Sequence, residues 1–64
     1  MKYIIREIQN AQSHRTGETI EAKNLADAKR TASRRQCFHG TVLVVEDQAG
    51  NRLAVKQDGR WADL

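Results

Sequence analysis

The stretch from Asn24 to Thr41 constrains most strongly what this chain can fold into, because it predicts one short helix followed by residues 36–41. Asn24 is a good N-cap, because its side-chain oxygen can accept a hydrogen bond from a free amide of the first turn. Asp27, three residues later, stands where a capping-box acid would stand and suits the positive N-terminus of a helix. The residues therefore predict a helix from Leu25, followed by the apolar run that begins after Gly40.

The two sides of this helix differ in size and charge. Leu25, Ala28 and Ala32 fall at i, i+3 and i+7, which places them on one narrow face. The small alanines allow that face to lie close to a sheet. The remaining arc is basic and consists of Lys29, Arg30, Arg34 and Arg35. We expect the alanine face to cover a sheet and the basic side to face outward.

Strand-like sequence lies on both sides of the helix. Residues 3–8 are rich in β-formers and predict a first strand, and residues 18–21, around Ile20, predict a short strand that pairs back on it. Residues 10–17 between them are polar and end in glycine, which predicts a loop. Residues 41–46 contain four consecutive apolar side chains and predict the central strand.

The register of the last strands depends on two turns. Residues 48–50 suit a three-residue loop with Gly50 in the left-handed position. That loop sets Val45 opposite Leu53 and Leu43 opposite Val55. These four residues then form the expected inner face. The other face consists of Glu46, Arg52, Ala54 and Lys56.

The position of Trp61 depends on the second turn. A two-residue loop at Asp58 and Gly59 places Trp61 opposite Lys56 on the outer face, whereas a three-residue loop that includes Gln57 places it opposite Val55 on the inner face. Burying the only tryptophan is worth about 2–3 kcal/mol, and a slip of one residue exchanges the faces, so the longer loop is favoured. The predicted fold is α+β: a single domain over residues 1–64 with a five-stranded antiparallel sheet and one helix packed on one face, in the order ββαβββ.

Length and composition limit the function. The chain has 64 residues, and a domain of this size buries only about 60% of its unfolded surface, so a core and a deep catalytic cavity do not both fit. A lone cysteine, Cys37, excludes an internal disulfide and fits a reducing compartment. No apolar run approaches the ~20 residues of a membrane span, and the N-terminus has no signal-peptide pattern. We expect a cytoplasmic protein without membrane contact.

Few residues suggest catalysis. Cys37 and His39 are too few to form a structural zinc site, which takes four ligands, and the only other histidine, His14, lies in the predicted loop. A Cys-His pair would need a third group to orient it, and none is evident. Glu46 and Asp47 precede a turn and are expected in solvent. We expect no enzyme activity, no metal, no cofactor and no small-molecule substrate, with Phe38 packed in the core.

The net charge of +3 is unevenly distributed. Residues 23–35 contain five basic side chains and one acid. A second basic set near the C-terminus consists of Arg52, Lys56 and Arg60. Such a surface favours an acidic partner, either nucleic acid or a protein that holds nucleic acid, although a solvated helix surface would have the same composition. Base stacking is poorly supported, because Phe38 and Trp61 are expected in the core.

Several segments in the same order along the chain resemble a family of small phage-encoded type I-F anti-CRISPR proteins, which inhibit the Csy (type I-F Cascade) surveillance complex. The most specific of these segments is residues 36–42. The others are residues 3–5, 20–22, 28–30, 32–33 and 60–61.

The resemblance implies a binding protein without catalysis. Members of that family bind the Cas7f backbone subunits and block hybridisation of target DNA to the guide RNA, and they are also associated with non-specific binding of double-stranded DNA by the inhibited complex. Carried over by position, Lys29, Arg30, Arg34 and Gln36 would contact Cas7f. Lys56 and Arg60 would be candidates for DNA contact. The alternative is a small basic phage protein that binds DNA or RNA directly, as an accessory or regulatory factor.

Overall fold

Five antiparallel strands form one sheet in the computed structural model, which describes residues 1–9, 17–36 and 40–64. The strands are β1 (Lys2–Ile8), β2 (Glu18–Glu21), β3 (Val42–Glu46), β4 (Arg52–Gln57) and β5 (Arg60–Asp63). The helix α1 (Leu25–Arg34) follows β2 in the chain. The strands lie in the order β2-β1-β3-β4-β5, so the most apolar strand is central. This arrangement confirms the predicted ββαβββ fold. No helix among the described residues is both long and apolar enough to cross a membrane.

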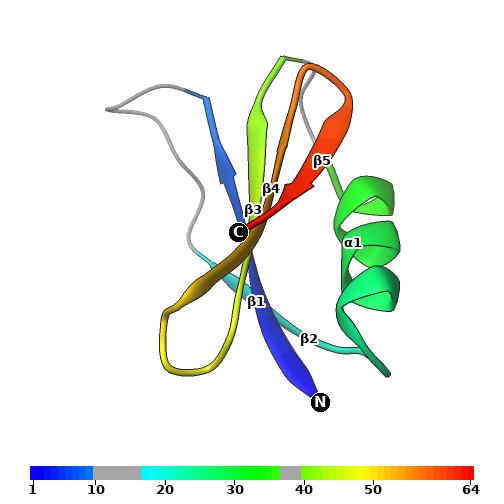
Figure 1. Cartoon of the computed structure of the whole chain (residues 1–64), viewed down its shortest axis with the longest axis vertical. Coiled ribbons are helices and arrows are strands. Elements are labelled where there is room, and N and C mark those ends of the chain that lie inside the picture. The colour runs from blue at the N-terminus through cyan, green and yellow to red at the C-terminus, as the bar shows by residue number, and fades with distance from the viewer. Residues whose placement is uncertain (10–16, 37–39) are drawn as a thin grey trace.

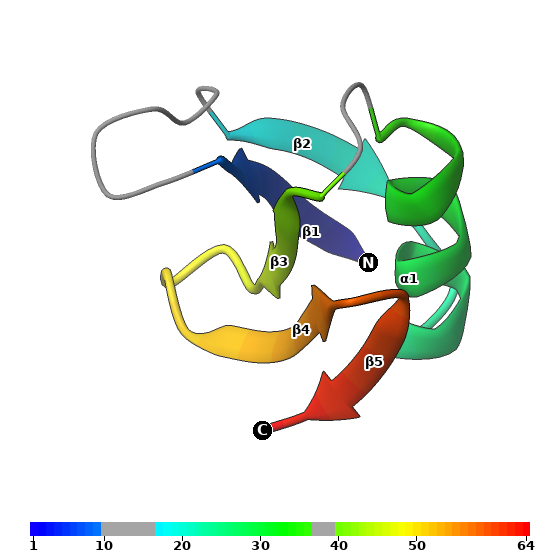
Figure 2. The same cartoon turned by 90° about the horizontal axis from the view of Figure 1, so that it is seen from above.

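The helix lies across one face of the sheet (Figure 1). Seen from above, the sheet curls around α1, which lies between β2 and β5 at the two edges (Figure 2). Ion pairs join the helix and its C-cap to the two edge strands: the C-cap residue Arg35 pairs with Glu18 of β2, and Lys29 of α1 pairs with Asp63 of β5. The edges are thus held to the helix by charge as well as by packing.

The core lies between α1 and this face. Ala28 and Ala32 are both 0% exposed, which confirms the predicted alanine face. They pack with Leu43 and Val45 of β3, while Leu25, Leu53 and Trp61 pack against the same cluster and are partly buried. The cluster is completed by residues that precede the helix: Tyr3, Ile5, Ile20 and Ala22.

The loop between β3 and β4 is the predicted one. The Asp47 amide donates to the Asn51 carbonyl at 3.0 Å, and Asp47 Oδ1 accepts from the amides of Ala49 and Asn51, each at 2.9 Å. Glu46 lies opposite Arg52, as expected. The chain therefore reverses over residues 48–50.

One residue beyond this loop, the predicted register is wrong. A shift between Val45 and Glu46 sets Val45 opposite Ala54 and Leu43 opposite Lys56. Leu53 is the extra residue, because a bulge sets two residues of one strand against one of the other. The carbonyl of Leu53 accepts a hydrogen bond from the Leu64 amide at 3.0 Å.

The bulge exchanges the faces of β4. Val55, expected on the inner face, lies opposite Val44 and therefore on the face away from the helix. Ala54 and Lys56, expected on the outer face, lie on the helix side, and Ala54 is 0% exposed. Alternation of side chains along a strand carries the shift through every following residue.

The favoured three-residue turn before Trp61 is wrong, and so is the predicted pairing of Trp61 with Val55. The turn is the two-residue one, with Asp58 at φ 54° and Gly59 at φ 77°, and it pairs Gln57 with Arg60 and Lys56 with Trp61. Two positive φ values suit a type I′ turn, which matches the twist of a hairpin. Because the bulge had already turned Lys56 to the helix side, Trp61 packs against the core as predicted.

Glu46 is not solvated as expected. It is 6% exposed, and its Oε1 accepts from Arg6 Nε at 3.0 Å. Arg6 lies opposite Val44 on the neighbouring strand, so the ion pair belongs to the face away from α1. The predicted packing of Phe38 lies outside the described residues.

Candidate partner-binding surface

The helix that carries most of the predicted contact residues begins as the sequence predicts. Asn24 Oδ1 accepts from the Asp27 amide at 2.9 Å, and Asp27 Oδ2 accepts from the Lys23 amide at 3.1 Å. That bond from Lys23 is the main cause that lowers the pKa of Asp27, and the charge of Arg30 acts in the same direction. The first turn is therefore anchored just before the basic side chains.

A shallow groove lies between the outward side of α1 and β5. It is lined by Ala26, Lys29, Arg30, Ser33, Arg34 and Trp61. Trp61 and Ala26 supply apolar surface, and three basic side chains surround it. We call this feature the Trp61 groove. It suits a partner that offers an apolar side chain together with acidic or carbonyl groups.

The three cations of the groove are not equivalent. Lys29 pairs with Asp63 and its side chain is only 20% exposed. Much of its charge is therefore neutralised within the protein. The Arg30 side chain is 70% exposed, with its guanidinium 3.7 Å from Asp27. Arg34 is exposed and donates to Thr31 Oγ1 at 3.3 Å. Arg30 and Arg34 therefore present most of the charge to solvent, and both belong to the contact set that the resemblance implies.

The hydroxyl of Ser33 joins the helix to the last hairpin. It accepts from Lys56 Nζ at 3.2 Å and from Trp61 Nε1 at 3.4 Å. The sequence predicts Lys56 on the outer face of the sheet, and the resemblance makes it a candidate for DNA contact. In the structure Lys56 is half-buried on the helix side. The register shift at Leu53 is the cause of this correction.

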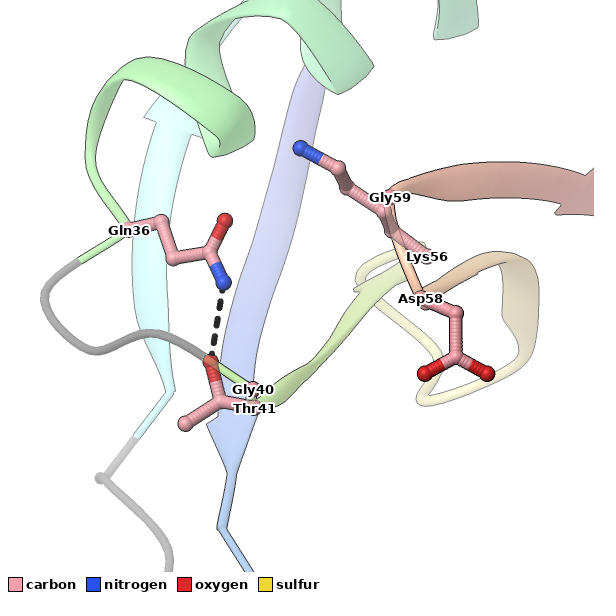
Figure 3. Close-up of a pocket in the computed structure, with 6 residues that line it drawn as sticks. All are labelled: Gln36, Gly40, Thr41, Lys56, Asp58 and Gly59. Atoms are coloured by element: carbon pink, nitrogen blue, oxygen red, sulfur yellow. Dashed lines mark hydrogen bonds between the residues drawn. The ribbon is translucent and has the colours of Figure 1, made fainter.

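Gln36 lies beyond the end of α1, in a second pocket. The pocket is lined by Gln36, Gly40, Thr41, Lys56, Asp58 and Gly59. Gln36 Nε2 donates to Thr41 Oγ1 at 3.0 Å. Figure 3 shows this bond, and it shows the Lys56 ammonium turned towards the helix. The structure thus divides the predicted contact set between two sites, with Lys29, Arg30 and Arg34 in the groove and Gln36 in the pocket.

Arg60 is exposed at the start of β5 and lines neither hollow. In residues 1–9, 17–36 and 40–64 no group of three or more His, Cys, Asp or Glu side chains could hold a metal ion. The predictions for His14, Cys37 and His39 lie outside these residues.

Sequence reasoning missed the part that Trp61 and Ser33 play in this surface. The sequence predicts Trp61 as a core residue alone, although tryptophan combines a large apolar ring with a hydrogen-bond donor and suits a partly exposed position. Ser33 follows Lys29 by four residues and Arg30 by three, so it lies beside both on a helix surface. That spacing was the available signal.

No family model and no curated protein matches the chain. Among solved structures it matches AcrIF9 with 54% sequence identity, covering 100% of this chain and 86% of that chain, at a TM-score of 0.88. The match covers the whole chain. The chain therefore belongs to the AcrIF9 family of type I-F anti-CRISPR proteins.

Proposed function

We propose that this protein binds the Cas7f backbone subunits of the type I-F Csy complex and prevents target DNA from pairing with the guide RNA. The observation that carries the proposal is the similarity to AcrIF9 over the full chain. The activity is one of occlusion, so it requires a stable surface and no reacting group. The host cytosol, where the complex works, is the proposed place of action.

The proposed contact surface is the Trp61 groove together with Gln36. Arg30 and Arg34 supply exposed charge, and the partly buried ring of Trp61 supplies an apolar anchor. Aromatic and arginine side chains at the centre of an interface commonly carry most of its binding energy. Lys29 contributes less in this arrangement, because its ammonium is held by Asp63.

We further propose that Arg60 and Lys56 contact double-stranded DNA held by the inhibited complex. Arg60 is exposed, whereas the Lys56 ammonium donates to Ser33. Lys56 would therefore have to leave Ser33 to reach a phosphate. For this reason the greater share of any DNA contact is assigned to Arg60.

Order of addition tests the proposal. Purified Csy complex is incubated with the protein and then given labelled target DNA, or given the DNA first and the protein second. When the protein is added first, it should abolish formation of the DNA–RNA hybrid. A pull-down of the complex should then recover the bound protein. Full hybridisation in the presence of saturating protein would contradict the proposal.

The dependence of binding on salt concentration distinguishes direct nucleic-acid binding from the proposed function. A protein that holds free DNA through phosphate contacts loses affinity steeply as salt rises. Tight, salt-sensitive binding to free DNA without the complex would favour the alternative function over the proposed one.

A further inference from the structure

A glutamate is buried on the helix side of the sheet. Glu7 is 4% exposed and lies opposite Leu43 of β3, in the same alternation as Tyr3 and Ile5. Burying a carboxylate in a small core is costly unless hydrogen bonds compensate it. One bond is short: the Thr41 hydroxyl donates to Glu7 Oε2 at 2.8 Å.

The bond between Thr41 and Glu7 fixes the direction of the hydrogen bond between Thr41 and Gln36. A threonine hydroxyl carries one proton and can accept through its lone pairs. Because that proton is directed to Glu7, Thr41 Oγ1 meets Gln36 as an acceptor, and Gln36 Nε2 donates to it at 3.0 Å. The reverse orientation would set the amide oxygen of Gln36 against another acceptor.

The three residues come from different parts of the chain. Glu7 belongs to β1, Gln36 follows α1, and Thr41 immediately precedes β3. Figure 3 shows the amide nitrogen of Gln36 turned to Thr41 and its carbonyl oxygen turned away from it. A buried group of the sheet therefore sets the orientation of a side chain that lines a surface pocket.

We propose that Glu7 and Thr41 are positioning residues for partner binding, which hold the Gln36 amide with its nitrogen inward before the partner arrives. The inference rests on the proposed function in that Gln36 is taken to contact the partner. Pre-organisation raises affinity because the ordering cost is not incurred on binding. The loss of one neutral hydrogen bond of about 1 kcal/mol corresponds to a roughly fivefold change in Kd.

A double-mutant cycle on binding to the Csy complex tests the proposal. Thr41→Val keeps the shape and removes the hydroxyl, Thr41→Ser keeps the hydroxyl, and Gln36→Ala removes the amide. Thr41→Val should weaken binding roughly fivefold, Thr41→Ser should bind as the parent does, and Thr41→Val should have no further effect when Gln36→Ala is present. Equal effects of Thr41→Val with and without Gln36 would overturn the positioning role.

A second measurement does not depend on binding. The side-chain NH₂ signals of Gln36 in an NMR spectrum should be well separated in the parent and in Thr41→Ser. The two signals should move from their parent positions in Thr41→Val, which removes the acceptor, and in Glu7→Gln, whose new amide can donate to Thr41 and release its proton towards Gln36. Unchanged Gln36 signals in both variants would overturn the inference.

The two measurements also separate this inference from the proposed function. If Gln36→Ala binds the complex as tightly as the parent does, the contact assigned to Gln36 is wrong, and so is a positioning role in binding. If Gln36→Ala weakens binding while Thr41→Val does not, the contact stands and only the inference fails.

Discussion

Lys56 and Trp61 lie directly opposite each other across the β4–β5 hairpin, and both donate to the hydroxyl of Ser33. This pairing exists because the bulge at Leu53 turns Lys56 to the helix side and the two-residue turn brings Trp61 beside it. The last hairpin is thus held to the outward side of α1, where it completes the Trp61 groove. The surface proposed for binding depends on the register of strands that lie far from the helix in sequence.

The packing of α1 gives the first prediction. Ala28 is 0% exposed against the sheet, and an unpaired charge there would be uncompensated. Ala28→Glu should lower the free energy of unfolding by about 3–5 kcal/mol. Ala26→Glu, on the exposed side of the same helix, is the matched control and should change stability little. Urea unfolding measures both, and equal stability of the two variants would contradict the packing described.

Trp61 gives the second prediction. Its ring is partly buried against the core and its Nε1 donates to Ser33. Trp61→Ala should lower the free energy of unfolding by about 2 kcal/mol, because a half-buried ring loses part of the 3–5 kcal/mol of a fully buried one. Trp61→Phe keeps most of the ring and should cost about 1 kcal/mol. A Trp61→Ala variant as stable as the parent would show that the ring does not pack as described.

The turn at Asp47 predicts that the free energy of unfolding depends on pH in the acidic range. Hydrogen bonds from Asn51, first from its side chain and then from its backbone amide, hold the pKa of Asp47 below its ordinary value. A carboxylate with a lowered pKa in the folded state stabilises the fold above its unfolded pKa and loses that contribution as pH falls through the folded value. The free energy of unfolding should therefore fall below about pH 4.

Asp47→Asn isolates this effect. The new amide oxygen can still accept from the backbone amides of Ala49 and Asn51, but position 47 no longer titrates. Chemical unfolding at several pH values should show a shallower loss of stability below pH 4 in the variant. The same slope in both proteins would contradict the role given to Asp47.

The helix could be predicted from the sequence because its signals are local. The cap at Asn24 and the spacing of Leu25, Ala28 and Ala32 lie within ten residues of one another. The loop after β3 was also predictable, since Gly50 at φ 89° suits the left-handed position assigned to it.

The bulge at Leu53 could not be predicted, because Val44 at 1% and Val45 at 0% exposed are equally buried on opposite faces. Either register therefore buries a valine of β3, and the pattern does not choose between them. This ambiguity affected the predicted site most, because the wrong register placed Lys56 on the wrong face of the sheet. The burial of Glu7 was missed for a related reason, as its bond to Thr41 joins residues 34 apart in the chain.

The central claim is that the outward side of α1 binds the Csy complex, and a charge reversal tests it most directly. Arg30 and Arg34 are exposed, so Arg30→Glu with Arg34→Glu should leave the fold intact. Lys2→Glu with Arg52→Glu is the matched control, because both residues are exposed on β1 and β4 and line neither hollow. Melting curves verify that both double variants are folded.

The deciding measurement is the Kd of each folded double variant for the Csy complex. Hydrogen bonds to charged groups are worth about 1.5–3 kcal/mol each, so the helix variant should bind about 10²- to 10⁴-fold more weakly than the parent and allow target DNA to hybridise. The control should bind and inhibit as the parent does. A folded helix variant that binds and inhibits as well as the parent would show that the interface lies elsewhere on the molecule.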